Sequence, residues 1–305
     1  MKVLFLQLVH PETDDRIIHQ MKTLREHGFT CSYKRNRSKD DAADIIICDT
    51  PKAVLCNIGY HGTVIYDVTE WYPSKKNLRP FHPFLRPLAA VAMVLLSFLA
   101  GIRTNRFIFG EKDKAKPFRF FFPWKKYEYL PYYPSRKFFA DVVEHREEDG
   151  PLRVLYAGPL TEEKGYFRAL NVAKKAGVEL IVIGPDQYMP LVDFCHYIQG
   201  FDVALDLRDC DAENRRCLPI KLFYYWAAGV APIYSDLDAI RSHVPAAHNA
   251  MFLVKNEQEA IAALKRLLSD PSLLDQYRKA GRQLHRDAYY WEAVEDRMIK
   301  IISQK

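Results

Sequence analysis

The sequence predicts an α/β protein made of two doubly wound domains. Its 305 residues suggest two domains at about 100–200 residues each. Short apolar runs of strand length alternate with segments of helical periodicity, and this alternation starts again near residue 151. A charged, turn-rich segment at 145–151 separates the halves and indicates a linker. With 49% hydrophobic and 27% charged residues, the composition is that of a globular protein and not of a disordered one.

The first half begins with a buried strand. Residues 3–9 form a continuous apolar run, which is typical of a parallel strand covered on both faces. Residues 17–26 then have apolar side chains at helical spacing, and Gly28 closes this predicted helix. Two more buried strands are expected at 44–48 and 63–67.

The second half repeats the pattern. Strands are expected at 153–157, 179–183, 203–206 and 231–235, and helices at 166–176, 221–228, 257–268 and 271–305. Within the helix at 221–228, Tyr225 and Trp226 are expected to pack in the core. Two doubly wound domains leave a cleft at the carboxyl ends of their strands, where ligands bind in such sheets.

Several kinds of site are not expected. The six cysteines form no CxxC pair, and a strand-like run follows Met1 directly, so we expect no disulfide framework, no structural zinc site and no signal peptide. A reducing cytosol is the natural setting. There is no GxGxxG after the first strand and no GxxxxGK[ST], so dinucleotide binding and P-loop hydrolysis lose support. The acids around 202–211 are scattered, and no metal site is predicted.

The positive charge is concentrated in one block. The chain has a net charge of +6, and residues 75–137 hold 14 lysines and arginines against three acids. Such a block attracts a polyanion: phospholipid headgroups, nucleic acid or a phosphorylated substrate. Aromatic residues such as Phe118 and Trp124 could stack bases. However, no nucleic-acid-binding motif is present, so nucleic acid is not the expected partner.

The same block contains a long apolar run at 88–102. As a helix its 15 residues would reach about 22 Å, short of the roughly 30 Å of a bilayer core. A spanning helix is therefore disfavoured, which leaves a buried core helix or a segment in the membrane interface. The basic flanks and the nearby aromatic residues favour an anionic membrane surface, although one helix could serve both roles. These aromatic residues are Phe81, Phe84, Phe118, Phe120, Phe121, Phe122 and Trp124.

Six segments carry a resemblance through their order and spacing. They are VIYDVTEWYP at 64–73, LPYYP at 130–134, YAGPLTEEKG at 156–165, LIVIG at 180–184, NRRCLPIKLFYYWAAG at 214–229 and YWE at 290–292. Together they resemble the family 4 glycosyltransferases of the GT-B fold, which build bacterial polysaccharides and glycolipids. The resemblance implies two Rossmann-like domains that face each other across a cleft. It implies an acceptor domain at 1–145, a nucleotide-sugar domain at 151–285 and a final helix at 286–305 that crosses back.

The resemblance also implies a reaction. A sugar would pass from a UDP- or GDP-linked donor to an acceptor, with retention of configuration and without a metal ion or other cofactor. Cationic side chains and helix-start amides must then stabilise the leaving diphosphate. Lys164 in the glycine-bracketed loop and Lys221 at the start of the donor helix are the candidates, because a lysine has the wrong charge for a helix amino terminus unless an anion binds there. Gly158 and Gly184 would let the backbone approach the donor closely.

The sequence departs from the family at both donor-site glutamates. Tyr224 replaces the glutamate that grips the ribose, and Arg216 stands eight positions earlier. The Tyr224 hydroxyl or Glu213, beside Asn214, could take over the ribose contact. Pro159 replaces an arginine that contacts phosphate in the family.

In the first half, Glu70 and Asp15 are the candidate catalytic residues. Glu70 follows a strand end and could orient or deprotonate the acceptor hydroxyl; the alternative is a surface or structural carboxylate. Asp15 and Arg16 lie in the turn after the first strand, and the alternative for them is helix capping by Asp14 or Asp15. The family has a histidine where this chain has Thr69.

The sequence thus predicts a peripheral membrane glycosyltransferase in the cytoplasm, on the inner leaflet of the plasma membrane. Its partners would be a nucleotide sugar, a lipid-linked or other saccharide acceptor, and an anionic membrane surface bound through 75–137. The alternative is a catalytically inactive GT-B-like binding subunit of a polysaccharide-assembly complex, which the missing glutamates favour.

Overall fold

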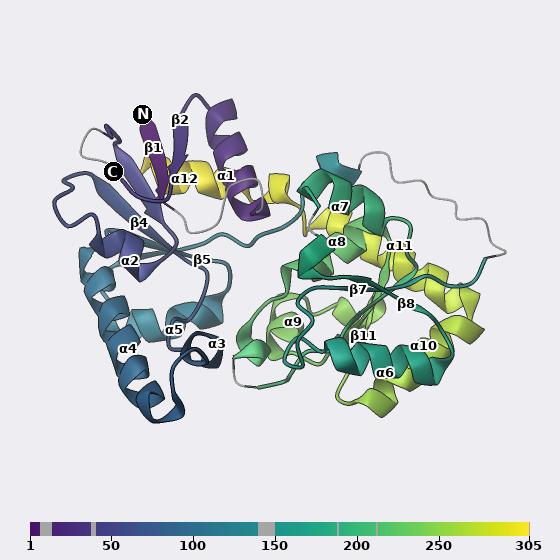
Figure 1. The fold of residues 1–305 in the computed structure, drawn as a ribbon. Helices are drawn as coiled ribbons and strands as arrows, with labels where there is room; N and C mark the ends of the chain where they lie inside the picture. Colours follow the sequence, from purple (N-terminus) through teal and green to yellow (C-terminus); the bar gives the residue numbers. More distant parts are fainter. Residues whose placement is uncertain (7–13, 38–40, 140–149, 188, 212, 305) are drawn as a thin grey trace. The chain divides into compact units, whose positions relative to one another are not determined.

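The computed structural model describes the chain apart from residues 7–13, 38–40, 140–149, 188, 212 and 305 and the side chains of Asp15, Lys75 and Lys76 (Figure 1). The chain divides into two compact units. Unit 1 is Met1–Tyr132 together with Val294–Lys305, and unit 2 is Tyr133–Ala293.

The passage from unit 1 to unit 2 comes at Tyr133, earlier than the expected end of the first domain at 145. The ring of Tyr133 packs 4.8 Å from the ring of Phe223, and its hydroxyl lies 2.5 Å from His243 Nε2. These contacts tie Tyr133 to unit 2. Most of the expected linker at 145–151 lies outside the described residues.

Unit 1 contains a parallel six-stranded sheet in the order β2-β1-β3-β4-β5-β6. Its strands are β1 Lys2–Leu6, β2 Thr30–Lys34, β3 Ile45–Cys48, β4 Thr63–Val68, β5 Arg106–Phe109 and β6 Lys126–Tyr129. Its helices are α1 Asp15–Glu26, α2 Pro51–Leu55, α3 Lys75–Leu78, the short η2 Pro83–Leu85, α4 Arg86–Arg103, α5 Lys112–Phe121 and α12 Glu295–Ser303. The strands predicted near β1, β3 and β4 are confirmed within the described residues, as is the helix that Gly28 follows.

Helices cover both faces of this sheet. Alternate strand residues such as Leu4, Ile46 and Phe107 pack with side chains of α2, α4 and α5. On the other face α1 packs with α12, and Thr23 donates a hydrogen bond to Glu295 at 3.1 Å. The last helix therefore belongs to unit 1, although the chain reaches it only after completing unit 2.

Unit 2 contains a parallel five-stranded sheet in the order β11-β10-β9-β7-β8. Its strands are β7 Val154–Ala157, β8 Leu180–Ile183, β9 Val203–Asp206, β10 Ala231–Ser235 and β11 Phe252–Val254. Its helices are α6 Tyr166–Ala176, α7 Leu191–Ile198, α8 Ile220–Ala228, α9 Asp238–His243, α10 Glu257–Ser269 and α11 Pro271–Asp287. Short helical turns add η3 Arg136–Phe139, η4 Pro185–Gln187, η5 Asn214–Arg216, η6 Ala247–Asn249 and η7 Trp291–Ala293. The predictions for β7 to β10, α6 and α8 are confirmed.

Close packing joins α8 to α11 in unit 2. Tyr225 and Trp226 are fully buried, as predicted. A Cβ at Gly281 of α11 would lie 2.6 Å from Trp226 Cδ1, so only glycine leaves room for the indole. The Trp226 Nε1–H donates to the Ala250 carbonyl at 3.3 Å, which satisfies its polar atom.

The segment 271–305, expected to be helical with its final helix at 286–305, is interrupted. Helix α11 ends at Asp287, and a break precedes α12. Within the break the amide of Trp291 donates to the Pro134 carbonyl at 3.0 Å, and the amide of Arg136 donates to Glu292 Oε2 at 3.2 Å. Trp291 is buried, so tertiary contacts override the helical periodicity.

Helix α4 is not the buried core helix that was one of the two expectations. Its buried residues are Ser97, Ala100 and Gly101, and its other side chains are exposed or partly exposed. The helix is also longer than the apolar run, because Arg86 and Arg103 are its ends. By length and composition alone, Pro83–Arg103 could cross a membrane. The argument from shortness against a spanning helix therefore does not hold.

Candidate functional site

The carboxyl edge of the unit 2 sheet brings two of the predicted residues into contact. Strand β7 ends at Ala157, and the ammonium group of Lys221, at the start of α8, donates a hydrogen bond to the Ala157 carbonyl. The next residue, Gly158, has φ +152°, and a Cβ there would lie 2.7 Å from Lys221 Nζ. Glycine thus leaves the space that the ammonium group occupies.

A buried ion pair at the end of β9 supports this edge. Arg208 Nε and Nη2 donate to the two oxygens of Asp206 at 2.7 and 2.6 Å, and the Tyr234 hydroxyl donates to Asp206 Oδ2 at 2.6 Å. Burial alone would raise the pKa of Asp206, but the facing Arg208 guanidinium and these hydrogen bonds hold it below its usual value. Asp206 is therefore a carboxylate already engaged by other groups.

Lys221 lies in a setting that disfavours its charge. Burial lowers its pKa to about 8; Asp206 opposes this shift, whereas Arg208 and Lys164 add to it by repulsion. An anion bound beside Lys221 would relieve the repulsion. We refer to Lys164, Arg208 and Lys221 together as the cationic edge.

Lys164 reaches the same edge from the loop between β7 and α6. Its Nζ lies 3.4 Å from Asn214 Oδ1 and 3.2 Å from Glu163 Oε1. Asn214 is buried, and its backbone amide donates to Asp211 Oδ1 at 2.9 Å. Asn214 therefore holds the lysine in place.

The loop that carries Lys164 is held tightly. The Tyr156 hydroxyl donates to the carbonyls of Pro159, at 2.7 Å, and Lys164, at 3.3 Å. Gly165 has φ +80°, and a Cβ there would lie 2.1 Å from the Leu207 carbonyl oxygen. Only glycine fits this position, which fixes where α6 begins.

The other predicted donor residues differ in their settings. Gly184 follows β8, and a Cβ there would lie 3.3 Å from Leu160 of the loop, so Gly184 lies at the same edge. Glu213 is exposed, and its amide donates to Asp211 Oδ1 at 3.1 Å. Tyr224 is only 2% exposed, and its ring packs 6.3 Å from the ring of Phe139. Its ring also lies 6.2 Å from the ring of Phe194, so Tyr224 packs among aromatic side chains.

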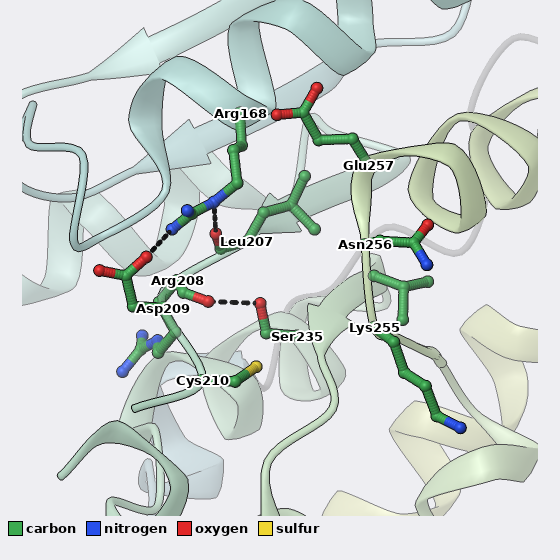
Figure 2. Close-up of a pocket in the computed structure, with 10 residues that line it drawn as sticks. Arg168, Leu207, Arg208, Asp209, Cys210, Ser235, Lys255, Asn256 and Glu257 are labelled. Atoms are coloured by element: carbon green, nitrogen blue, oxygen red, sulfur yellow. Dashed lines mark hydrogen bonds and ion pairs between the residues drawn. The ribbon is translucent and has the colours of Figure 1, made fainter. Parts of the chain in front are cut away.

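A small pocket adjoins the cationic edge (Figure 2). Its volume is about 130 Å³, and it lies where β9, β10 and β11 end. Arg168 of α6 donates to the Leu207 carbonyl at 2.6 Å and pairs with Asp209 at 2.7 Å. The Ser235 hydroxyl donates to the Arg208 carbonyl at 2.7 Å. The pocket was not predicted, because its residues come from four separate segments. They are Arg168, Leu207, Arg208, Asp209, Cys210, Ser235, Val254, Lys255, Asn256 and Glu257.

In unit 1 the two predicted catalytic residues lie on different elements. Asp15 is the first residue of α1, and its side chain lies outside the described part of the structure. The alternative of helix capping is confirmed for Asp14, whose carboxylate accepts from the Arg16 amide at 3.1 Å. Glu70 is partly buried in the turn after β4. Burial, with nearby Asp49 and Glu70, raises the pKa of Tyr72.

Sequence reasoning missed a buried polar cluster in unit 1. Asp67, fully buried near the end of β4, accepts from the Tyr132 hydroxyl at 2.5 Å and from Gln20 Nε2 at 3.2 Å. Arg16 Nη1 lies 3.6 Å from Asp67 Oδ2. Burial opposes the charge of Arg16, but Asp67 and Asp14 outweigh it and raise the pKa of the guanidinium. The sequence feature that could have indicated this cluster is the carboxylate of Asp67 inside the mostly apolar strand β4.

Comparison with known proteins identifies the fold. No protein-family model and no curated protein sequence matches the chain. Solved structures do: sucrose-phosphate synthase from Thermosynechococcus elongatus has a TM-score of 0.72 at 12% identity, covering 99% of this chain and 98% of that one. Alr3699/HepE from Anabaena, solved with UDP-glucose, has a TM-score of 0.68 at 12% identity, covering 99% of each chain. WaaG, a glycosyltransferase involved in lipopolysaccharide biosynthesis, has a TM-score of 0.64 at 10% identity, covering 100% of each chain. The predicted two-domain GT-B fold is thereby confirmed.

Proposed function

We propose that this chain is a glycosyltransferase that moves a sugar from a UDP- or GDP-linked donor to an acceptor. The observation that carries the proposal is the Lys221 ammonium group beside Gly158, at the carboxyl edge of a parallel sheet. Ligands bind at this edge in open α/β sheets. The likeness to a protein solved with UDP-glucose supports a nucleotide sugar as the ligand.

The cationic edge suits the chemistry of the leaving group. When the glycosidic bond breaks, negative charge grows on the nucleoside diphosphate, and fixed cations stabilise it most where water is excluded. We assign this role to Lys221 and Lys164, without a metal ion, and expect retention of configuration. Gly158 and Gly184 would let the backbone approach the diphosphate. Asn214 would position Lys164, because its side-chain oxygen lies 3.4 Å from that ammonium group.

For the ribose we propose Glu213 and not Tyr224. Glu213 is exposed near the cationic edge, two residues beyond Asp211, whereas Tyr224 is packed among rings. Carboxylates accept hydrogen bonds from sugar hydroxyls readily. Glu70 remains our candidate for orienting the acceptor hydroxyl in unit 1, together with Asp15.

The acceptor is proposed to be lipid-linked, and the protein to work as a peripheral enzyme on the cytoplasmic face of the plasma membrane. This part of the proposal is supported by the basic and apolar composition of 75–137 and by the exposed apolar side of α4. WaaG, whose activity serves lipopolysaccharide biosynthesis, has the same fold.

A catalytically inactive binding subunit is the second candidate. Arg216 and Tyr224 stand where the resembling family has glutamates, and Tyr224 is buried. Such a protein would bind a nucleotide sugar or a saccharide without breaking the glycosidic bond.

A donor screen separates the two candidates. We expect UDP or GDP to raise the melting temperature of the full chain, because a ligand that binds only the folded state stabilises it. Incubation with UDP-, GDP- and ADP-sugars should then release the nucleoside diphosphate slowly from one of them. Binding without release would favour the inactive subunit. A melting temperature that UDP, GDP and ADP all leave unchanged would contradict the transferase.

Diphosphate affinity is predicted to depend on pH through Lys221. Below its pKa of about 8 the lysine is cationic and attracts the anion; above that value the free protein loses the charge. The Kd for UDP or GDP should therefore be flat from pH 6.5 to 7.5 and rise by up to about tenfold per pH unit above 8, until the pKa of the complex is reached. Calorimetric titration measures this profile. The Lys221→Arg variant, which stays charged, should give a flat profile to pH 9.5, and a wild-type profile equally flat would contradict the assignment.

A further inference from the structure

Between Leu88 and Ile102 the outer side of α4 carries no polar side chain. Only Ser97 among residues 88–102 is polar, and it is buried. Taking 100° per residue, the exposed apolar side chains of α4 occupy an arc of roughly 200°. They are Leu88, Val91, Val94, Leu95, Leu96, Phe98, Leu99 and Ile102. An amphipathic helix in water has its apolar side inward; α4 has the opposite arrangement.

Neighbouring segments extend this surface. Phe84 in η2 is 89% exposed, and Trp124, just after α5, is 71% exposed. The ring of Phe98 in α4 lies 5.9 Å from the ring of Phe121 in α5, which joins the two helices into one surface. We call the exposed apolar residues of η2, α4 and the end of α5, together with Trp124, the apolar face. A contiguous exposed apolar surface of this kind marks an interaction site.

Charge identifies the partner. No carboxylate occurs between Glu70 and Glu111, and exposed cations precede and follow the apolar segments in the sequence. They include Arg79, Arg86, Lys112, Lys116 and Lys126. A second copy of this chain on the same face would bring like charges together, whereas anionic phospholipid satisfies both the cations and the apolar side chains.

The inner side of α4 is fixed to unit 1. A Cβ at Gly101 would lie 2.3 Å from the ring of Phe122, so the backbone of α4 packs directly against this ring. Lys125 Nζ donates to the Ile102 carbonyl at 2.9 Å, and Arg103 donates to the Tyr60 carbonyl. The carboxyl-terminal half of α4, which holds its buried residues Ser97, Ala100 and Gly101, is thus anchored to unit 1, and the helix presents its other side outward.

We propose that α4 lies in the plane of an anionic membrane, with the apolar face inserted at the headgroup boundary and the surrounding cations on the headgroups. This inference deepens the membrane part of the proposed function and does not depend on the donor chemistry. Binding is measured without a nucleotide sugar, so its failure and a failure of donor turnover can be told apart.

The first test is flotation of the full chain with vesicles. We expect at least tenfold tighter binding to vesicles of phosphatidylcholine with 30% phosphatidylglycerol than to phosphatidylcholine alone, and weaker binding at high salt. Leu88→Ser/Leu95→Ser should lower binding at least tenfold. The matched control, Leu170→Ser/Val192→Ser, changes two exposed apolar residues of unit 2 and should have no effect.

A second pair of variants tests the charges. Arg79→Glu/Arg86→Glu should remove the preference for phosphatidylglycerol, whereas Lys174→Glu/Lys175→Glu on exposed positions of α6 makes the same change in net charge and should retain it. Absence of binding by the wild type, or equal losses in variant and control, would overturn the proposal. If the apolar face instead joined two copies, the wild type would sediment as a dimer that Leu88→Ser/Leu95→Ser dissociates, which would also overturn it.

The depth at which residues of α4 lie in the bilayer distinguishes an in-plane helix from a spanning one. Leu88, Leu95 and Ile102 are seven residues apart and lie on the same side of α4. Each is replaced singly by tryptophan in a Trp124→Phe background, and emission is quenched by lipids brominated near the headgroup or near the bilayer centre. An in-plane helix gives equal, shallow quenching at all three positions. Quenching that is deepest at position 95 and shallow at the other two would show a spanning helix and overturn the proposal.

Discussion

Replacing Lys221 with methionine is expected to lower donor turnover by about 10²–10³-fold, the loss seen when a single preorganised donor to a developing anion is removed. Methionine keeps the apolar stem of the side chain and removes only its charge. The affinity for UDP or GDP should fall as well, because the ground-state diphosphate already carries the charge that Lys221 faces. Lys164→Met should have a smaller effect, since Lys164 is 31% exposed and pairs with Glu163.

The same variant should be more stable than the wild type, and this separates a lost function from a lost fold. The folded-state pKa of Lys221, about 8, lies below its ordinary value of 10.5, so folding disfavours the charged form. The penalty is complete below pH 8 and disappears as the pH rises from 8 to 10.5. At pH 7, Lys221→Met should therefore raise the melting temperature in the absence of ligand. Lys174→Met, on the exposed side of α6, is the control for removal of a lysine. Unchanged turnover and affinity in Lys221→Met would refute its role at the leaving group.

The strands in the middle of the sheets could be predicted because they are covered on both faces. Residues 45–47 and 203–205 are continuous apolar runs, and both are buried strands. Strand β2 was missed since it lies at the sheet edge, where exposed and partly buried side chains alternate. Strand β5 begins with Arg106, and a charged residue is not typical of a buried strand. Its guanidinium donates to the carbonyls of Ile301 in α12 and of Gln304 just after it, nearly 200 positions away.

The candidate site could be predicted in part. Lys221 and Gly158 were found because a lysine at a helix start and a glycine after a strand are local signals. The Asp206–Arg208 pair was not, because two charged residues near the end of a strand look like a polar loop until β10 supplies Tyr234. Tyr224 is a different case. Its position in a motif suggested a ligand contact, whereas in the structure its ring packs against the rings of Phe139 in η3 and Phe194 in α7.

Replacing Asp206 with alanine is expected to cost unit 2 about 3–5 kcal/mol of stability, because the guanidinium of Arg208 would stay buried without its partner. The side chains of Asp206 and Arg208 are 5% and 10% exposed, so water cannot readily replace the lost carboxylate. The pair also contributes to acid stability. Since the pKa of folded Asp206 is held below 3.8, its contribution is present at neutral pH and is lost as the pH falls through that depressed value.

Two comparisons make this prediction specific to a buried charge. The Asp206→Ala/Arg208→Leu double variant removes both ions and should recover most of the stability that Asp206→Ala loses. Asp236→Ala breaks a carboxylate–guanidinium pair whose arginine, Arg241, is 57% exposed, and it should cost no more than about 1 kcal/mol. The readout is the urea midpoint of the full chain, followed by tryptophan emission, to which the buried Trp226 and Trp291 of unit 2 contribute. If Asp206→Ala and Asp236→Ala shift the midpoint equally, removal of Asp206 does not leave the Arg208 guanidinium buried without a partner. The cationic edge would then lack the rigid support that stabilisation of a leaving diphosphate requires.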